Sequence, residues 1–393
     1  MINKLTKIFA DKFNTSEKPL MYFAPGRVNI IGEHIDYNEG FVLPTAINLG
    51  TYAVVSLRND DLINFVSHNF TDSFVVNKND LQYNEIHNWA NYPKGVMFVL
   101  AQAGHKISQG FNVLYYGNLP NQAGLSSSAS IELATAVMLN DLFDFKIEML
   151  DLVKFALQAE NNYIGLNCGI MDQFAIGMGK KNYAVLLNSH SLQYEYIPVN
   201  LGNYNFVITN TMKKRSLVDS KFNERQNECS AALNIIQKEM NVNSLCQLNL
   251  EDYKKIEHLL TDENLKKRAL HVISENIRTM QAVQKLKSND LQGLGQLLNQ
   301  SNLSLKNNYE VTGFELDTLQ AIAVKQKGVL GSRMTGAGFG GCNITLISKD
   351  CINDFIKIVK IEYSQKTGLN PESIIMQSDD GARKIAEEYY HGN

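Results

Sequence analysis

The spacing of apolar residues changes several times along the first half of the chain and predicts strands followed by helices. Short β-branched and aromatic runs, separated by Asn/Asp turns, predict an antiparallel meander and one further strand: 51–58, 62–67, 73–77 and 111–116. Apolar residues at helical spacing then predict helices over 128–145 and 150–166. A strand, a loop and a helix are therefore expected to meet near Ser126.

The second half mixes helices and strands, which predicts an α+β fold class. Three more strands are predicted at 183–187, 194–199 and 205–209, and helical spacing dominates from Arg215 to Gly331. The last elements predicted are a strand, a helix and a strand, at 343–348, 352–366 and 373–377. The change in composition near residue 200 predicts two lobes, residues 1–200 and 201–393.

Composition and charge exclude several classes of protein. The 393 residues include 37 Lys and Arg against 40 Asp and Glu, a net charge of −3, which argues against nucleic-acid binding. No apolar run approaches the 18 residues of a membrane span, and the N-terminus lacks the apolar core of a signal peptide. Five widely spaced cysteines without a C-x-x-C pair fit a reducing compartment, so a cytoplasmic location is expected.

The first polar motif, G-R-V-N-I-I-G-E-H-I-D-Y-N at 26–38, groups charged and hydrogen-bonding side chains around a short apolar core. Glu33, His34 and Asp36 could ligate a metal, but the run lacks the second histidine of a zincin. A sugar fits better, because its hydroxyls need both carboxylate acceptors and imidazole or amide donors. A polar turn that only solvates a loop is the alternative, and the chemistry alone leaves both open.

The second motif, L-P-N-Q-A-G-L-S-S-S-A-S at 119–130, leads into the predicted helix at 128–145. Backbone amides and hydroxyls at a helix N-terminus favour an anion, so this loop is a candidate phosphate site. The Walker A pattern is absent from the chain, so any nucleotide site has another design. A serine that simply caps the helix is the alternative.

The third motif, M-T-G-A-G-F-G-G-C at 334–342, contains the G-x-G-x-x-G spacing of dinucleotide-binding folds. The residues after Cys342 predict a strand, whereas that fingerprint must open into a helix, so we reject a dinucleotide site. The glycines are expected to let the backbone approach another loop or a phosphate-bearing ligand. A plain tight turn is the alternative.

Two acids stand in apolar surroundings. Asp172 lies in C-G-I-M-D-Q-F, and Glu160 falls on the same helical stripe as apolar residues. An acid in such a place needs a partner, caps a helix or acts as a base. Arg27 or a magnesium ion would serve as the partner.

With these residues in place, the chain resembles the galactokinases of the GHMP small-molecule kinase superfamily. The resemblance rests on the three motifs above together with C-G-I-M-D-Q-F, which occur in the family's order across residues 26–342. It implies a two-lobed α+β fold, with an N-terminal lobe like ribosomal protein S5 and a ferredoxin-like C-terminal lobe. It also implies phosphorylation of D-galactose at the C1 hydroxyl by ATP with Mg²⁺, as in galactose catabolism.

The resemblance also implies a role for each matched position. The positions that match sugar-binding residues are Glu33, His34, Ile35, Asp36, Asp172 and Phe222. The positions that match ATP-binding residues are Ser67, Gln122, Ala123, Gly124, Leu125, Ser126, Ser127 and Ser128. Ser128 and Glu160 match the Mg²⁺ ligands, Asp172 matches the catalytic base, and Arg27 matches the cation beside it. Trp89 is placed with Ser67 on the adenine side, with ordinary packing as its alternative.

Two residues depart from the family's pattern. Phe222 stands where the family usually has a tyrosine that contacts the sugar, so one neutral hydrogen bond is lost. Gln122 stands where the phosphate loop usually has glycine, which weakens nucleotide binding if that position needs a positive φ.

Two other functions remain as alternatives. One is a kinase for N-acetylgalactosamine, whose signature near 30–37 is very similar, and the other is a sensor that binds galactose and ATP without turnover. The complete serine run at 126–130, with Arg27 and Asp172, favours catalysis over sensing. The expected partners are galactose and ATP, with neither nucleic acid nor membrane, and the expected state is a monomer.

Overall fold

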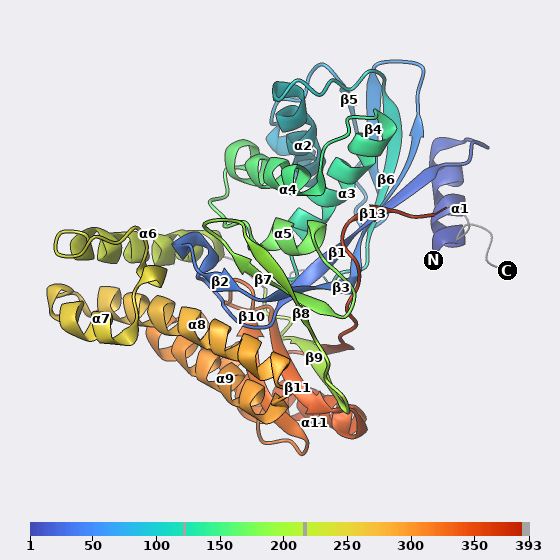
Figure 1. Ribbon diagram of the computed structural model, residues 1–393. Helices are drawn as coiled ribbons and strands as arrows, with labels where there is room; N and C mark the ends of the chain where they lie inside the picture. Colours follow the sequence, from blue (N-terminus) through green and yellow to red (C-terminus); the bar gives the residue numbers. More distant parts are fainter. Residues whose placement is uncertain (121–122, 215–217, 387–393) are drawn as a thin grey trace.

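The computed structural model describes residues 1–120, 123–214 and 218–386 (Figure 1). The helices are α1 (Ile2–Phe13), α2 (Asn91–Gln102), α3 (Ser127–Leu142), α4 (Met149–Gln158), α5 (Met171–Gly177), α6 (Val218–Ile236), α7 (Leu250–Ile256), α8 (Glu263–Lys287), α9 (Leu291–Ser304), α10 (Gly313–Ala323) and α11 (Ile352–Thr367). The strands are β1 (Leu20–Asn29), β2 (Phe41–Val42), β3 (Pro44–Leu57), β4 (Leu62–Ser67), β5 (Phe74–Asn77), β6 (Phe111–Gly117), β7 (Tyr183–Asn188), β8 (Tyr194–Pro198), β9 (Tyr204–Asn210), β10 (Val329–Thr335), β11 (Cys342–Ser348), β12 (Glu372–Ile375) and β13 (Arg383–Lys384). Long helices and mostly antiparallel sheets confirm the predicted α+β class.

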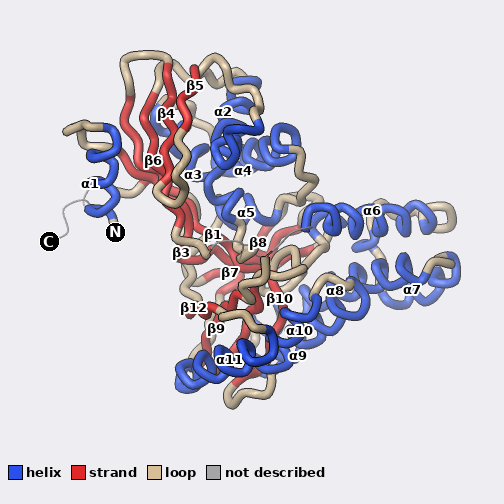
Figure 2. The backbone as a smooth tube through the Cα atoms, turned by 180° about the vertical axis from the view of Figure 1, so that it is seen from behind, coloured by secondary structure: helices blue, strands red, loops and turns tan. Residues whose placement is uncertain are grey.

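A six-stranded sheet in the order β13-β1-β3-β6-β4-β5 organises the first part of the molecule. Alternate residues of its strands face opposite ways. Met21 and Leu114 face α1, whereas Tyr22 and Tyr115 belong to the large core that includes residues of α2 to α5. Figure 2 shows this sheet from behind, with α1 beside it. The sheet is therefore covered by helices on both faces.

The central strand β1 was not predicted, because Pro25 and Gly26 interrupt its β pattern. The pairing of β1 with β3 shifts register between these two residues, so the strand bulges there. A side chain at Gly26 would come within 2.7 Å of the Leu125 carbonyl oxygen. Glycine therefore lets Leu119 and Leu125 lie directly against the strand.

The predicted antiparallel meander is wrong in one connection. β4 pairs with β5 in the antiparallel sense, but β6 lies between β3 and β4 and runs parallel to β4. A Cβ at Gly110 would meet the Leu62 carbonyl oxygen at 2.1 Å, so glycine lets the start of β6 enter beside β4. Such a non-local contact is invisible to a local turn pattern.

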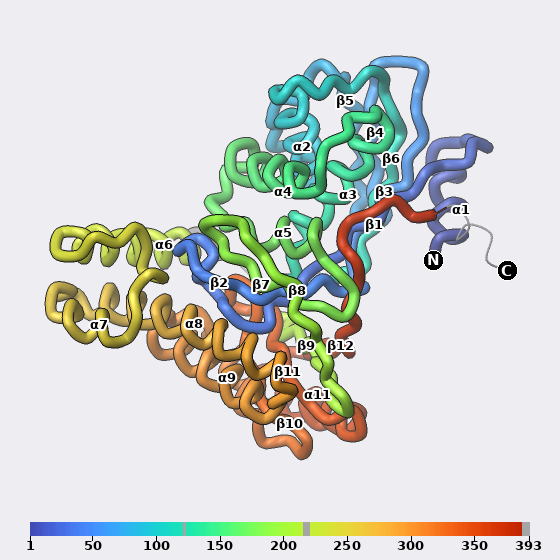
Figure 3. The backbone as a smooth tube through the Cα atoms, viewed as in Figure 1, coloured from blue at the N-terminus to red at the C-terminus, as the bar shows by residue number. Residues whose placement is uncertain are grey.

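Two further sheets complete the fold. The four-stranded sheet β10-β11-β9-β12 is antiparallel, and β2-β7-β8 lies between the two larger sheets (Figure 3). Phe206 and Ile208 of β9 pack with α9, whereas Val207 packs with α10 and α11. After β12 the chain returns to the first sheet, where β13 pairs with β1. The predicted division into two lobes at residue 200 stays a prediction. The segment that ends in β13 belongs to the second half of the sequence but pairs with a strand of the first half.

Three helical predictions need correction in detail. The helix expected over 150–166 ends at Gln158, and a π-helical turn over Ala159–Ile164 follows it. The helix expected to run to residue 145 ends at Leu142. The helical stretch expected from Arg215 to Gly331 ends slightly earlier, because β10 begins at Val329, and residues 215–217 lie outside the described residues. Helices α1 and α2 were not predicted. Among the described residues, no helix combines the length and the apolar character that spanning a membrane demands.

Candidate functional site

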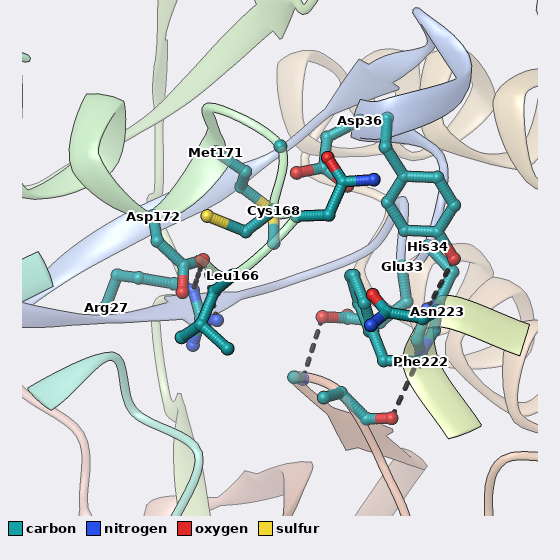
Figure 4. A pocket seen from close by; sticks show the side chains of 15 residues that line it. Arg27, Glu33, His34, Asp36, Leu166, Cys168, Met171, Asp172, Phe222 and Asn223 are labelled. Carbon is teal, nitrogen blue, oxygen red and sulfur yellow. Dashed lines mark hydrogen bonds and ion pairs between the residues drawn. The ribbon is translucent and has the colours of Figure 1, made fainter. Parts of the chain in front are cut away.

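A cavity of about 160 Å³ brings together the polar motif of 26–38, α5 and α6 (Figure 4). Its lining includes six of the predicted site residues, and five of these are Arg27, Glu33, His34, Asp36 and Asp172. Phe222 lines it too, from α6. Residues almost two hundred positions apart thus meet around one space, as the resemblance implied.

Asp172 lies at the start of α5 and is held by two neighbours. The Arg27 side chain donates through Nε to Oδ1 at 2.7 Å, and its Nη2 lies 2.7 Å from the same oxygen. The Ser126 hydroxyl donates to Oδ2 at 2.5 Å. Arg27 also donates to the Gly124 carbonyl oxygen at 2.8 Å. The expected pairing of Arg27 with Asp172 is confirmed, and both residues are joined to the loop before α3.

Ser126 is the residue before α3, but it does not cap the helix through its side chain. Its backbone has a φ of 62°, in the left-handed region, and its hydroxyl bonds Asp172 instead. Such a backbone conformation is costly for a non-glycine residue. The simple capping alternative for Ser126 is therefore wrong.

Asp36 lies against the start of α5 and faces the cavity. Its carboxylate accepts hydrogen bonds from the backbone amides of Tyr37 and Met171. A Cβ at Gly169 would come within 2.1 Å of Asp36 Oδ2, so glycine provides the space for this carboxylate. Burial, and secondarily the charge of Asp172, raise the pKa of Asp36 to about 6. Burying the ionised form is therefore unfavourable.

We predict that Asp36→Asn stabilises the folded protein at pH 8 by about 1–2 kcal/mol while weakening galactose binding. Because the pKa of Asp36 is raised in the folded protein, protonation of this carboxyl group stabilises the fold. The full contribution is present only below the pKa that Asp36 has in the unfolded chain. That contribution is lost as the pH rises towards 6. Urea unfolding should therefore show a constant advantage of the variant from pH 8 down to about pH 6, and a shrinking advantage as the pH falls further towards the ordinary pKa of 3.8. Asp72→Asn, at an exposed position, is the control. A variant less stable at pH 8 would contradict this account.

Glu33 is almost fully buried, and both of its oxygens are occupied. Oε1 accepts the Gly336 backbone amide at 2.7 Å, and Oε2 accepts Asn29 Nδ2 at 3.0 Å and forms an ion pair with Arg333. Burial raises the pKa of Glu33, and Arg333 opposes that rise. Glu33 thus joins β1 to β10 as well as forming part of the cavity wall.

The His34 ring is buried, and both of its nitrogens are engaged. Nε2 lies 3.2 Å from the Ala337 carbonyl oxygen, which can only accept, and Nδ1 lies 2.8 Å from the Tyr37 hydroxyl. Nε2 therefore carries the proton, and Tyr37 donates to Nδ1. Burial and the neighbouring His271 lower the pKa of His34 to about 3, so the ring is neutral.

Ile35 and Phe222 differ in how they meet the cavity. The Ile35 side chain is fully buried in the core and does not line the cavity, which corrects the expectation for this side chain. The side chain is buried against other apolar side chains of the core, and this burial stabilises the fold. Phe222 is half-buried, with its ring centre 5.5 Å from that of His34 and 5.1 Å from that of Tyr37.

A second cavity, of about 200 Å³, has the first residues of α3 in its wall. Ser67, Trp89, Ser127 and Ser128 line it. The Trp89 ring stacks on Phe70 with 6.3 Å between centres, and its Nε1 has no hydrogen-bond partner among the described residues. A buried donor of this kind needs an acceptor, which a purine ring could supply. The structure brings Ser67 and Trp89 together with the serine run.

Glu160 and Ser128 are the candidate metal ligands, and they lie in contact. The Ser128 hydroxyl hydrogen-bonds to Glu160, which is buried in the π-helical turn after α4. Burial raises the pKa of Glu160. No group of three or more His, Cys, Asp or Glu that could hold a metal occurs in the described part of the chain. Two hard oxygen donors nevertheless fit a Mg²⁺ ion that takes its other oxygens from phosphates and water.

The glycine-rich motif at 334–342 meets the loop before α3. It is followed by β11, so the rejection of a dinucleotide fingerprint is confirmed. Gly336 has a φ of 87°, and a Cβ there would lie 2.9 Å from the Gly124 carbonyl oxygen. The expected close approach of another loop is therefore confirmed. Ala123 and Leu125 are buried in this loop, and Gln122 lies outside the described residues.

Several residues of the site were missed. Tyr37, Cys168, Met171 and Asn223 also line the first cavity, and Arg333 holds Glu33. Tyr37 and Cys168 stand inside the motifs already singled out, so the motifs could have found them. Arg333 stands in β10 just before the glycine motif, and only its charge within an apolar strand marks it.

Comparison with known families gives three matches along the chain. Residues 7–57 match the galactokinase galactose-binding signature, residues 91–180 the N-terminal domain of GHMP kinases, and residues 282–365 their C-terminal domain. The three matches follow the order in which the motifs occur.

Individual relatives match almost the whole chain. A galactokinase of Clostridium beijerinckii is 48% identical over 382 residues, covering 97% of each chain, and one of Bacillus subtilis is 45% identical over 390 residues, covering 99% of this chain and 100% of the relative. The crystal structure of Lactococcus lactis galactokinase complexed with galactose superposes with a TM-score of 0.95 at 42% identity, covering 98% of this chain and 100% of that one. Mevalonate kinase of Methanococcus jannaschii, at 18% identity and a TM-score of 0.65, covers 93% of this chain and 100% of its own and shares the fold.

Proposed function

The chain belongs to the galactokinases of the GHMP kinase family, and we propose from this premise that its first cavity binds galactose and its second cavity binds ATP. The activity is the ATP-dependent phosphorylation of galactose. The finer assignment is transfer to the C1 hydroxyl, giving galactose 1-phosphate.

The observation that carries this assignment is the position of Asp172 where the two cavities approach each other. Asp172 lines the first cavity and accepts a hydrogen bond from Ser126, whose neighbours Ser127 and Ser128 line the second. A sugar hydroxyl in one cavity and a terminal phosphate from the other would thus meet beside this carboxylate. Such an arrangement supports in-line phosphoryl transfer.

Each residue at this junction has a distinct proposed role. Asp172 accepts the proton of the C1 hydroxyl as that oxygen attacks the phosphorus. Arg27 orients Asp172 and offsets negative charge on the transferring group. The backbone of the loop at 123–128 lies at the start of α3, where amides favour phosphate oxygens. A divalent cation held by Ser128 and Glu160 would neutralise charge on the phosphates.

Substrate recognition is assigned to the polar wall of the first cavity. Asp36 offers a carboxylate directly to a sugar hydroxyl, because its other contacts are backbone amides. Glu33 and His34 shape the wall and contribute to its charge and hydrogen bonding, although their side-chain atoms already have partners. Phe222 adds an apolar ring to this wall, beside His34 and Tyr37.

The test is ADP release from purified protein with Mg²⁺ and ATP, with galactose, N-acetylgalactosamine and mevalonate offered separately. We expect release with galactose and production of galactose 1-phosphate by ³¹P NMR. Release with N-acetylgalactosamine alone would overturn the assignment of the sugar. ATP and galactose binding without release would identify a sensor instead.

We expect Phe222→Tyr to lower the KM for galactose by about two- to tenfold with little change in kcat. One added neutral hydrogen bond contributes about 0.5–1.5 kcal/mol, and the ring already lies in the cavity wall. Steady-state kinetics with varied galactose measure the effect. Phe314→Tyr, on the exposed surface of α10, is the matched control. An unchanged KM would mean that the ring edge does not face the sugar.

Three further assignments belong to the proposal. They are the Mg²⁺ site, a monomeric state and a cytoplasmic location. None of the five cysteines forms a disulfide bond in the described part of the chain, which accords with the last of these.

A further inference from the structure

Four polar side chains form a chain that runs from the second cavity into the core of the helical layer. The Ser128 hydroxyl hydrogen-bonds to Glu160. Gln173 Nε2 donates a very short hydrogen bond to Glu160 Oε2 and a second one, of 3.3 Å, to Glu132 Oε2. Glu132 and Gln173 are completely buried, and neither lines the first or the second cavity. The chain therefore links three helical segments, because Glu132 belongs to α3, Glu160 to the turn after α4, and Gln173 to α5.

Glu132 is a buried acid for which no cationic partner occurs among the described residues. Its other oxygen, Oε1, has no hydrogen-bond partner among the described residues, and its charged neighbours are the acids Glu160 and Asp172. Burial, and then Glu160, raise the pKa of Glu132 well above its ordinary value. A neutral carboxyl group is the form that such surroundings tolerate.

Packing alone does not account for an acid at this position. A leucine would fill similar space in the apolar interior of α3 without removing a carboxyl group from water. Glu132 also lies one helical turn beyond Ser128, and Gln173 follows Asp172 directly. The hydrogen bond between Glu132 and Gln173 therefore connects the helix that carries Ser128, a candidate metal ligand, with the helix that carries Asp172, the candidate base.

We propose that Glu132 and Gln173 are positioning residues that hold Glu160 in the orientation needed to bind the divalent cation. Glu132 fixes the Gln173 amide, and the amide fixes one oxygen of Glu160, which leaves the other oxygen free of Gln173. This inference rests on the proposed function, in which Ser128 and Glu160 hold the cation. Partners that orient metal ligands typically contribute tenfold to a hundredfold to metal affinity.

The decisive measurement is the dissociation constant of Mn²⁺ from the complex of the enzyme with a nonhydrolysable ATP analogue, followed by electron paramagnetic resonance. We expect Glu132→Leu to weaken Mn²⁺ binding about tenfold, without lowering the melting temperature or the affinity for galactose. Glu132→Gln, which keeps a neutral acceptor of the same shape, should bind Mn²⁺ within about twofold of the unchanged protein. Gln173→Leu should reproduce the loss and replaces Glu132→Leu if that variant does not fold.

The outcomes separate this inference from the proposed function. If Glu160→Gln leaves Mn²⁺ binding intact, the assignment of the cation site is wrong. The proposed reaction would not be affected by that result, because galactose-dependent ADP release tests it independently. If Glu160→Gln abolishes Mn²⁺ binding but Glu132→Leu and Gln173→Leu do not weaken it, only the positioning role is overturned. A lower melting temperature with unchanged Mn²⁺ affinity would likewise show that the hydrogen bond between Glu132 and Gln173 is merely structural.

Discussion

Replacing Asp172 by asparagine should lower the turnover of galactose by about 10²- to 10⁴-fold while leaving galactose affinity nearly unchanged. The amide keeps the shape of the side chain and one oxygen for the Arg27 hydrogen bond, but it cannot take a proton from the C1 hydroxyl. Because the transferring phosphoryl group needs little covalent help, the loss should stay within the range of general-base catalysis.

Single-turnover kinetics and calorimetric titration with galactose measure the two effects separately. Asp151→Asn is the matched control, because Asp151 is exposed on α4 and makes a surface ion pair with Lys154. We expect unchanged turnover in that control. Turnover of Asp172→Asn within a factor of a few of the unchanged protein would remove Asp172 from the role of base.

The strand, loop and helix around Ser126 could be predicted because their signals are local. β6 consists mainly of aromatic and aliphatic residues, and α3 has sustained helical spacing. β1 failed on the same criterion, since Pro25 and Gly26 are turn residues by composition. Their use in a central strand depends on the bulge and on the approach of Leu125, which is distant in sequence. Local patterns cannot report such contacts.

Residues of the candidate site could be predicted where a charged side chain stands within an apolar stretch of the sequence. An acid inside an apolar run marked Asp172, and the structure pairs it with Arg27. Glu132 is the same kind of signal, because it is an acid among the apolar residues of α3. For Glu33, the motif predicted a polar site but could not predict the partner. Arg333, which forms the ion pair with Glu33, is three hundred positions away in the sequence.

Arg333→Met should destabilise the protein by about 3–5 kcal/mol, because it breaks a buried ion pair. Arg333 is completely buried in β10, and Nη1 donates to the carbonyl oxygens of Asn29 and Ile30 at 3.0 and 3.1 Å. Removing it leaves the buried Glu33 without its cation and two carbonyl groups without their donor. Urea unfolding at pH 7.5 measures the loss.

The double variant Glu33→Gln/Arg333→Met separates the charge from the packing in that loss. If the uncompensated Glu33 carboxylate dominates, the neutral amide should restore a large part of the lost stability, because no buried charge remains. If the unpaired carbonyl groups dominate, the double variant should be no more stable than Arg333→Met. Lys154→Met, which breaks an exposed ion pair on α4, should change stability by less than about 1 kcal/mol. A loss below that value for Arg333→Met would mean that Glu33 does not depend on this pair to connect β1 with β10.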